Sequence, residues 1–364
     1  MNPFTVIMVV FAMLGALDRI IGNKFGLGEE FEHGFRILGP VVLSMVGMIV
    51  LAPWLAEVMR PVCAFMQSSL GMDPSILPAA LFANDMGGAS LCDAVAVDPV
   101  IGRLNGLVVS AMMGCTVSFT IPYSLETVKK EQHRELLIGL LCGVTTIPVG
   151  CFIAGLMLAI PLPALLVNLA PLIAFAALIV IGLLRCPDVC VKIFNAFGIA
   201  IRILITVGLA LSILDYTIGI RLIPNLGSFD EAMGICIGAC VMLAGTFPLM
   251  HVVSRLLRRH MRRLGGKAGI NEVSAIGLLG QLATSRTAYE TMKHMDKKGV
   301  VLNAAFSVSG AFLIGGHLAF TMAMDATLVE EMIAGKLIAG VLAVIVASFV
   351  YGRLYGGNKA EQSS

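Results

Sequence analysis

The chain has 364 residues, of which 58% are hydrophobic and only 13% are charged, with a net charge of +2 and a mean hydropathy of +0.92. This composition excludes a water-soluble globule, because too few polar side chains are available to cover its surface. The chain is therefore expected to be an all-α polytopic membrane protein whose main partner is the lipid bilayer.

Nine segments are long and apolar enough to cross a membrane, since a helix needs about 20 mostly apolar residues to span the hydrocarbon core. In chain order they are residues 4–21, 35–59, 104–123, 136–160, 165–184, 199–218, 233–256, 300–322 and 332–351. The first has no preceding basic residue and no small-residue cleavage site after it, so it is interpreted as a span with its N-terminus outside rather than as a signal peptide. The polar tail, residues 357–364, is expected to be disordered and cytosolic.

Two further segments, residues 74–97 and 270–292, are too polar for ordinary spans, and we interpret both as re-entrant. That topology places 21 of the 25 basic residues on the cytosolic side, as the positive-inside rule predicts. The four left outside are Arg60, Arg103, Arg221 and Lys336. Two full crossings would instead move several basic loops outside.

The pattern L-x-x-L-D-x-x-I-G occurs twice, at residues 14–22 and 211–219. A register offset by one further residue then continues and relates the two polar segments to each other. The sequence thus predicts a first repeat, residues 1–195, with five spans, and a second repeat, residues 196–356, with four. The odd number of spans in the first repeat inverts the second. Two inverted repeats facing each other are the architecture of a secondary transporter.

The strongest candidate site is Asn84-Asp85-Met86-Gly87-Gly88, in the first polar segment. A carboxylate at membrane depth is costly, so it usually faces a cavity, a partner or a substrate. Adjacent glycines bend the backbone and expose carbonyl groups, which suits a small cation. The alternative is that Asp85 caps the next short helix and the glycines allow close packing.

Other polar groups at membrane depth have structural alternatives. Asn105 and Asn303 occupy equivalent positions in the two repeats and could bind substrate or join helices. His317 could be a substrate or proton group or a hydrogen-bonded core residue. Ser285 and Arg286 lie in the second polar segment, where Arg286 could pair with Glu290 one turn later or face the cavity and attract an anion. The full set of candidate substrate-binding residues is Asn84, Asp85, Gly87, Gly88, Asn105, Ser285, Arg286, Asn303 and His317.

No zinc-ligand spacing, Walker loop or dinucleotide-binding glycine pattern occurs, so we expect no metal, cofactor or nucleic-acid partner and no enzymatic activity. A homo-oligomer and coupling to protons, sodium or no ion all remain open. An intramembrane enzyme acting on lipid head groups, with Asp85 and His317 as acid and base, is the rival of a different class. Within transport, Asp85 and Arg286 together would suit a zwitterion such as a small amino acid.

Seven short motifs are spread along the chain: M-V-G-M at 45–48, A-P at 52–53, D-M-G-G at 85–88, T-I-P-V-G-C at 146–151, M-K-H-M-D at 292–296, N-A-A-F-S-V-S at 303–309 and G-H-L at 316–318. Through these motifs the chain resembles, over nearly its whole length, the EutH-type ethanolamine permeases of bacterial ethanolamine-utilisation operons. The chain departs from the family pattern at residues 284–287, which are Asn-rich in the family, and at Gly316, where the family has Asp. Both departures bear on substrate identity.

The resemblance implies uptake of ethanolamine across the bacterial inner membrane. The predicted role of Asp85 is to bind the ammonium group, while Asn84 and nearby carbonyls accept its remaining protons. Rocking of the two repeats would alternate access to the site.

Overall fold

The computed structural model describes residues 3–355, and within that range the chain forms helices and no strands. The all-α polytopic architecture is therefore confirmed, while the tail expected at 357–364 lies outside the described residues. The α-helices are α1 (Pro3–Ile20), α2 (Leu27–Arg36), α3 (Leu38–Leu70), α4 (Ile76–Leu81), α5 (Gly88–Val95), α6 (Pro99–Arg103), α7 (Ile121–Thr127), α8 (His133–Met157), α9 (Leu162–Arg185), α10 (Pro187–Ile218), α11 (Phe229–Ala268), α12 (Glu272–Gly280), α13 (Arg286–Thr291), α14 (Lys297–Ser309), α15 (Gly316–Asp325) and α16 (Val329–Tyr355). Shorter 3-10 or π-helical segments are η1 (Asn84–Met86), η2 (Leu104–Gly114), η3 (Thr116–Thr120), η4 (Lys130–Gln132), η5 (Met292–His294) and η6 (Ala326–Leu328).

Within residues 3–355, eight helical runs are long and apolar enough to cross a membrane. The eighth expected span, 300–322, is not a continuous helix, because α14 ends at Ser309 and α15 begins only at Gly316. Phe312 between them has a positive φ of 60°. The backbone N–H groups of Phe312 and Ile314 donate to the carbonyls of Gln281 and Leu282, at 2.9 and 2.7 Å, instead of continuing the helix.

Each of the two polar segments folds back on itself. In the first, α4 and α5 flank η1, and Asp73 joins the two ends by accepting the N–H groups of Val97 and Asp98 at 3.0 and 2.9 Å. In the second, α12 and α13 flank a break, and Asn271 donates from its backbone to Asp296 Oδ1 at 2.8 Å. Each segment thus ends next to where it starts, which is the geometry expected of a re-entrant segment.

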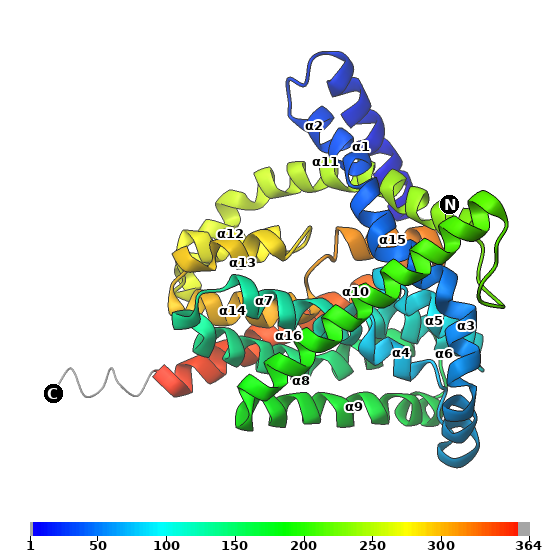
Figure 1. The fold of residues 1–364 in the computed structure, drawn as a ribbon. Helices are drawn as coiled ribbons and strands as arrows, with labels where there is room; N and C mark the ends of the chain where they lie inside the picture. Colours follow the sequence, from blue (N-terminus) through cyan, green and yellow to red (C-terminus); the bar gives the residue numbers. More distant parts are fainter. Residues whose placement is uncertain (1–2, 356–364) are drawn as a thin grey trace.

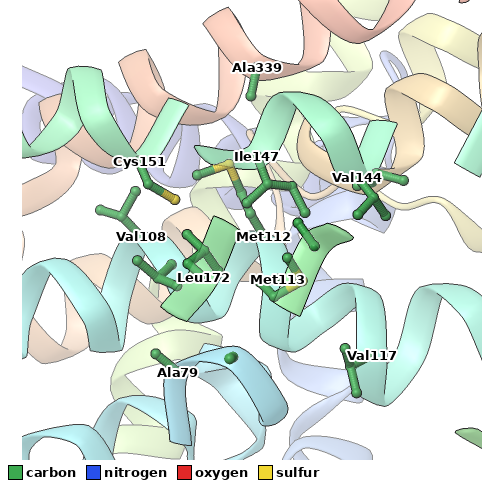
Figure 2. Close-up of a cluster of buried hydrophobic side chains, with 14 of the residues drawn as sticks. Ala79, Val108, Met112, Met113, Val117, Val144, Ile147, Cys151, Leu172 and Ala339 are labelled. Carbon is green, nitrogen blue, oxygen red and sulfur yellow. The ribbon is translucent and has the colours of Figure 1, made fainter. Parts of the chain in front are cut away.

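The run from α6 to α7 forms the centre of the molecule. In its most apolar stretch 94% of the residues are buried, and most of the run, η2 and η3, is π-helical. Figure 2 shows its side chains Val108, Met112 and Met113 packed between α4, α8, α9 and α16. Wide helical turns of this kind are rare and frequently lie at functional sites.

The first two helices form a hairpin that Figure 1 shows at the top of the molecule, beside the long helix α11. Asp18 at the end of α1 accepts the backbone N–H groups of Phe25, Leu27 and Gly28, at 2.8 to 3.0 Å. These bonds supply partners to the free donors at the start of α2. Asp18 is therefore a helix cap rather than a ligand.

A buried pair of asparagines fixes the first polar segment to its neighbours. Asn105 in η2 donates to Ser75 Oγ at 2.8 Å and to Asn168 Oδ1 at 3.0 Å, and Asn168 in α9 donates back at 2.9 Å. Both asparagines are at most 1% exposed. One reciprocal amide pair thus joins three elements that are distant in sequence.

We expect the substitution Asn168→Leu to lower thermal stability, because it leaves the buried amide of Asn105 without its partner, at a cost of about 1–3 kcal/mol. The measurement is the melting temperature of the purified protein in detergent. Asn195→Leu, at an exposed helical position in α10, is the matched control. Equal melting temperatures for the two variants would contradict a structural role for the pair.

Candidate functional site

Three breaks in helical structure meet in the interior of the protein. The first break covers residues 82–87, the second 281–285 and the third 310–315. The second and third are joined by the backbone hydrogen bonds of Phe312 and Ile314. The first approaches the third so closely that a Cβ placed on Gly316 would lie 3.7 Å from Asp85 Oδ2. Residues from both halves of the chain therefore form one site.

The two glycines after Asp85 determine the shape of the first break. Gly87 has a φ of +84°, and a Cβ at this position would lie 2.0 Å from Met48 Cγ in α3. A Cβ on Gly88 would lie 2.5 Å from the carbonyl oxygen of Phe82. A side chain at position 87 would therefore push the break away from α3, and one at position 88 would open the turn itself. The predicted role of this pair in bending the backbone agrees with this geometry.

Asp85 is partly buried, and its carboxylate lies beside the N-terminus of α15. It does not cap α5, because the N-cap residue is Gly87 and no side chain accepts a hydrogen bond there. The capping interpretation therefore does not apply. A helix N-terminus favours a negative charge close to it, and the cationic groups whose field reaches this carboxylate are Lys336 and Arg286.

Buried polar side chains without hydrogen-bond partners surround the three breaks. In the part of the chain that the structure describes, no partner exists for either polar atom of Asn84, for Ser285 Oγ, Ser309 Oγ, His317 Nδ1 or Thr321 Oγ1. All five residues are at most 2% exposed. An unpaired buried polar group costs about 1–3 kcal/mol, so such groups are rare outside ligand-binding and catalytic sites. Their positions in or next to the three breaks are those expected of a site for a small polar molecule.

Not all predicted residues lie at this site. Both side-chain N–H groups of Asn303 are used, in bonds of 2.9 Å to the carbonyls of Ser274 and Gly299, and its Oδ1 accepts from Gln281 at 2.8 Å. Both N–H groups of Asn105 are likewise used in bonds to Ser75 and Asn168. The structure thus brings together Asn84, Asp85, Gly87, Gly88, Ser285 and His317, while Asn105 and Asn303 hold neighbouring helices.

Arg286 lies at the wall of a cavity. The cavity has a volume of about 900 Å³, and its lining includes Met86, Ser118, Phe119, Glu126, Arg202 and Arg286. The Arg286 guanidinium carbon lies 5.6 Å from the centre of the Phe119 ring. Among residues 3–355 it forms no ion pair with Glu290, which instead accepts a hydrogen bond from Tyr123 at 3.3 Å. Of the two interpretations of Arg286, the cavity-facing one fits this geometry.

A smaller cavity of about 180 Å³ also lies near the first break, because its lining includes Ala89, next to Gly88. Its lining includes Asp93, Arg103 and Asp325. Arg103 in α6 and Asp325 in α15 form an ion pair, with Nη1 and Oδ2 3.4 Å apart. This pair connects the two halves of the chain where the smaller cavity begins.

Lys336 is a charged residue of this region that sequence reasoning missed. The charge count placed Lys336 on the outer side of the membrane. In the structure it lies in the first third of α16, and only 1% of the residue is exposed. Its Nζ donates to the carbonyl of Ala111 in η2 at 2.8 Å, and its field reaches Asp85. A lysine inside the apolar segment 332–351 was the available signal, because ionisable residues at membrane depth are rare and usually functional.

The chain is similar to known proteins over almost its entire length. The sequence profile of the family described as "Ethanolamine utilisation protein, EutH" matches residues 2–350. A "Probable ethanolamine permease EutH" from Listeria monocytogenes is 40% identical over 358 residues, covering 98% of this chain and 96% of that protein.

Two further relatives are more distant. The "Probable ethanolamine permease EutH" of Salmonella typhimurium is 34% identical, and the "Uncharacterized protein YxeR" of Bacillus subtilis is 35% identical, each covering 94% of this chain and 93% of its own length. No solved structure matches the chain. The family match and the near-complete overlap with its members show that this multi-pass membrane protein belongs to the EutH family of ethanolamine utilisation proteins.

Proposed function

We propose that the protein carries protonated ethanolamine into the cell across the bacterial inner membrane, with Asp85 binding the ammonium group. The observation that supports this most directly is the position of Asp85 where three helical breaks meet, beside buried polar groups that have no partners among residues 3–355. The names of the relatives from Listeria and Salmonella point to the same substrate.

The chemistry of ethanolamine matches these groups. A primary amine with a pKa near that of lysine, about 10, is mostly protonated at neutral pH and crosses hydrocarbon poorly in that form. An ammonium donates three hydrogen bonds, and the Asp85 carboxylate and Asn84 Oδ1 are acceptors. The substrate hydroxyl both donates and accepts, so Ser285 Oγ and His317 Nδ1 are suitable partners. We assign the ammonium to the first break and the hydroxyl to the second and third.

Two features support an alternating-access mechanism. The larger cavity reaches Met86 from the side of α10 that carries Arg202, the side that the charge count assigns to the cytosol. On the other side, the Arg103–Asp325 ion pair lies at the smaller cavity. We therefore propose that this is the inward-facing state, in which the ion pair closes the outer path.

We also propose that residues 1–195 and 196–356 are inverted repeats that move relative to each other. Equivalent contacts at positions offset by 198 residues support this proposal. Asp98 and Asp296 each cap the helix after a polar segment, and Asn105 and Asn303 each connect the run after a polar segment to that segment.

A zwitterion such as a small amino acid is the second candidate substrate. Arg286 favours it, because this cation lines the large cavity and its field reaches Asp85. An unlabelled zwitterion that inhibits uptake of labelled ethanolamine would identify it as a shared substrate, whereas no inhibition would restrict the carrier to amines.

We expect purified protein in liposomes to take up labelled ethanolamine saturably, and Asp85→Asn to raise the half-saturating concentration at least tenfold. The neutral amide cannot replace the charge-assisted bond, which contributes about 1.5–3 kcal/mol, or roughly 10- to 100-fold in affinity. Acidic buffer on both sides limits leakage of the neutral amine. Asp230→Asn, at an exposed position in α11, is the control. Unchanged uptake kinetics for Asp85→Asn would contradict the role of the carboxylate.

The proposed topology predicts opposite accessibility for single cysteines introduced at Val97 and Lys297, at the ends of the two polar segments. Both residues are exposed, and neither side chain takes part in the bonds that join the segment ends. In intact cells, with the exposed Cys186 and the partly exposed Cys63 and Cys190 replaced by Ser, a membrane-impermeant thiol reagent should label Val97→Cys, and Lys297→Cys only after permeabilisation. Labelling of both from the same side would contradict the inversion.

A further inference from the structure

The buried ammonium of Lys336 has no role in the function proposed above. Around it the backbones pack closely: a Cβ on the preceding Gly335 would lie 2.9 Å from the carbonyl oxygen of Gly150 in α8 and 3.3 Å from Val108 Cγ1 in η2. This packing separates the lysine from lipid and from bulk water. One of its three N–H donors is used, in the bond to Ala111.

Isolated buried charges are strongly unfavourable, so a buried ammonium normally lies near an opposite charge. Asp85 is the carboxylate whose field acts on Lys336. The geometry explains this proximity, since Ala111 is three residues before Gly114, where a Cβ would lie 1.9 Å from the carbonyl oxygen of Phe82 in the first break. Within residues 3–355 no ion pair of 4 Å or less joins Lys336 to Asp85. The two groups are therefore close to each other without direct contact.

We propose that Lys336 is an internal counter-cation of Asp85 that takes the electrostatic place of the substrate when the carrier is empty. This inference rests on the proposed function. Lysine and ethanolamine present the same chemical group, a primary ammonium, to the same carboxylate. Substrate binding adds the second cation in direct contact with Asp85, while the Ala111 carbonyl holds the lysine.

Two consequences follow for transport. Lys336 weakens substrate binding, because the ammonium of the substrate enters a field that another cation has partly neutralised. It also helps the empty carrier to return to the outward-facing state. Every reorientation passes through a closed intermediate, and a buried carboxylate without any counter-charge would raise the free energy of that intermediate. Lys336 thus acts on the substrate through Asp85 and is a positioning residue.

Comparing net uptake with exchange in liposomes tests this role, because only net uptake requires the empty carrier to reorient. For Lys336→Met we expect net uptake of ethanolamine to fall at least tenfold, exchange against internal ethanolamine to persist, and the half-saturating concentration for exchange to fall. Lys336→Arg, which keeps the charge, should restore part of the net uptake. Lys298→Met is the matched control, because Lys298 also donates to a backbone carbonyl, that of Ala268, at 2.7 Å but at a partly exposed position.

Equal loss of net uptake and exchange in folded Lys336→Met, or no change in either, would overturn the proposal. If Lys336→Met does not fold, the double variant Asp85→Asn/Lys336→Met decides, because removing both charges should restore folding if they compensate each other. A double variant no more stable than the lysine variant would overturn the inference. Absence of both net uptake and exchange in the wild-type protein would instead count against the proposed function, while the stability comparison would still test the interaction of the charges.

Discussion

The structure depends on hydrogen-bond partners for the backbone groups of broken helices inside a membrane protein. Backbone N–H and C=O groups that leave a helix at membrane depth need partners, because hydrocarbon supplies none. Here two breaks supply partners to each other, through the bonds from Phe312 and Ile314 to Gln281 and Leu282. In the first break, the missing side chain of Gly87 allows contact with Met48 of α3, and that of Gly88 allows close approach to the carbonyl oxygen of Phe82. The remaining polar side chains lie in or next to the breaks, near Asp85. The arrangement of breaks that satisfies these backbone groups therefore also forms the candidate site.

The surroundings of these breaks also explain why charged groups can lie there. The π-helical run from α6 to α7 is almost completely buried and contacts both Lys336, through Ala111, and the first break, through Gly114. The large cavity reaches the same region from the side of α10, next to Arg286. Asp85 therefore has two cationic residues in its surroundings, the buried Lys336 and the cavity-lining Arg286. An ammonium that bound at Asp85 would compete with these charges of the protein itself.

Much of this could be predicted from the sequence, for identifiable reasons. Long apolar segments predicted most spans, and D-M-G-G predicted a bent backbone with a carboxylate, because composition and glycine act locally. The third break could not be predicted, since residues 300–322 are apolar enough for a continuous helix and the break depends on carbonyls of Gln281 and Leu282. The amide network of Asn105 and Asn168 also depends on tertiary contacts, as does the burial of Lys336.

Binding of an ammonium where the three breaks meet can be tested by equilibrium binding of labelled ethanolamine to the purified protein, with two competitors that each keep part of the substrate. Ethylamine has the ammonium without the hydroxyl, and ethylene glycol has hydroxyls without the ammonium. We expect ethylamine to displace ethanolamine and ethylene glycol at the same concentration not to displace it. Displacement by ethylene glycol but not by ethylamine would contradict this expectation, because recognition would then not depend on the positive charge.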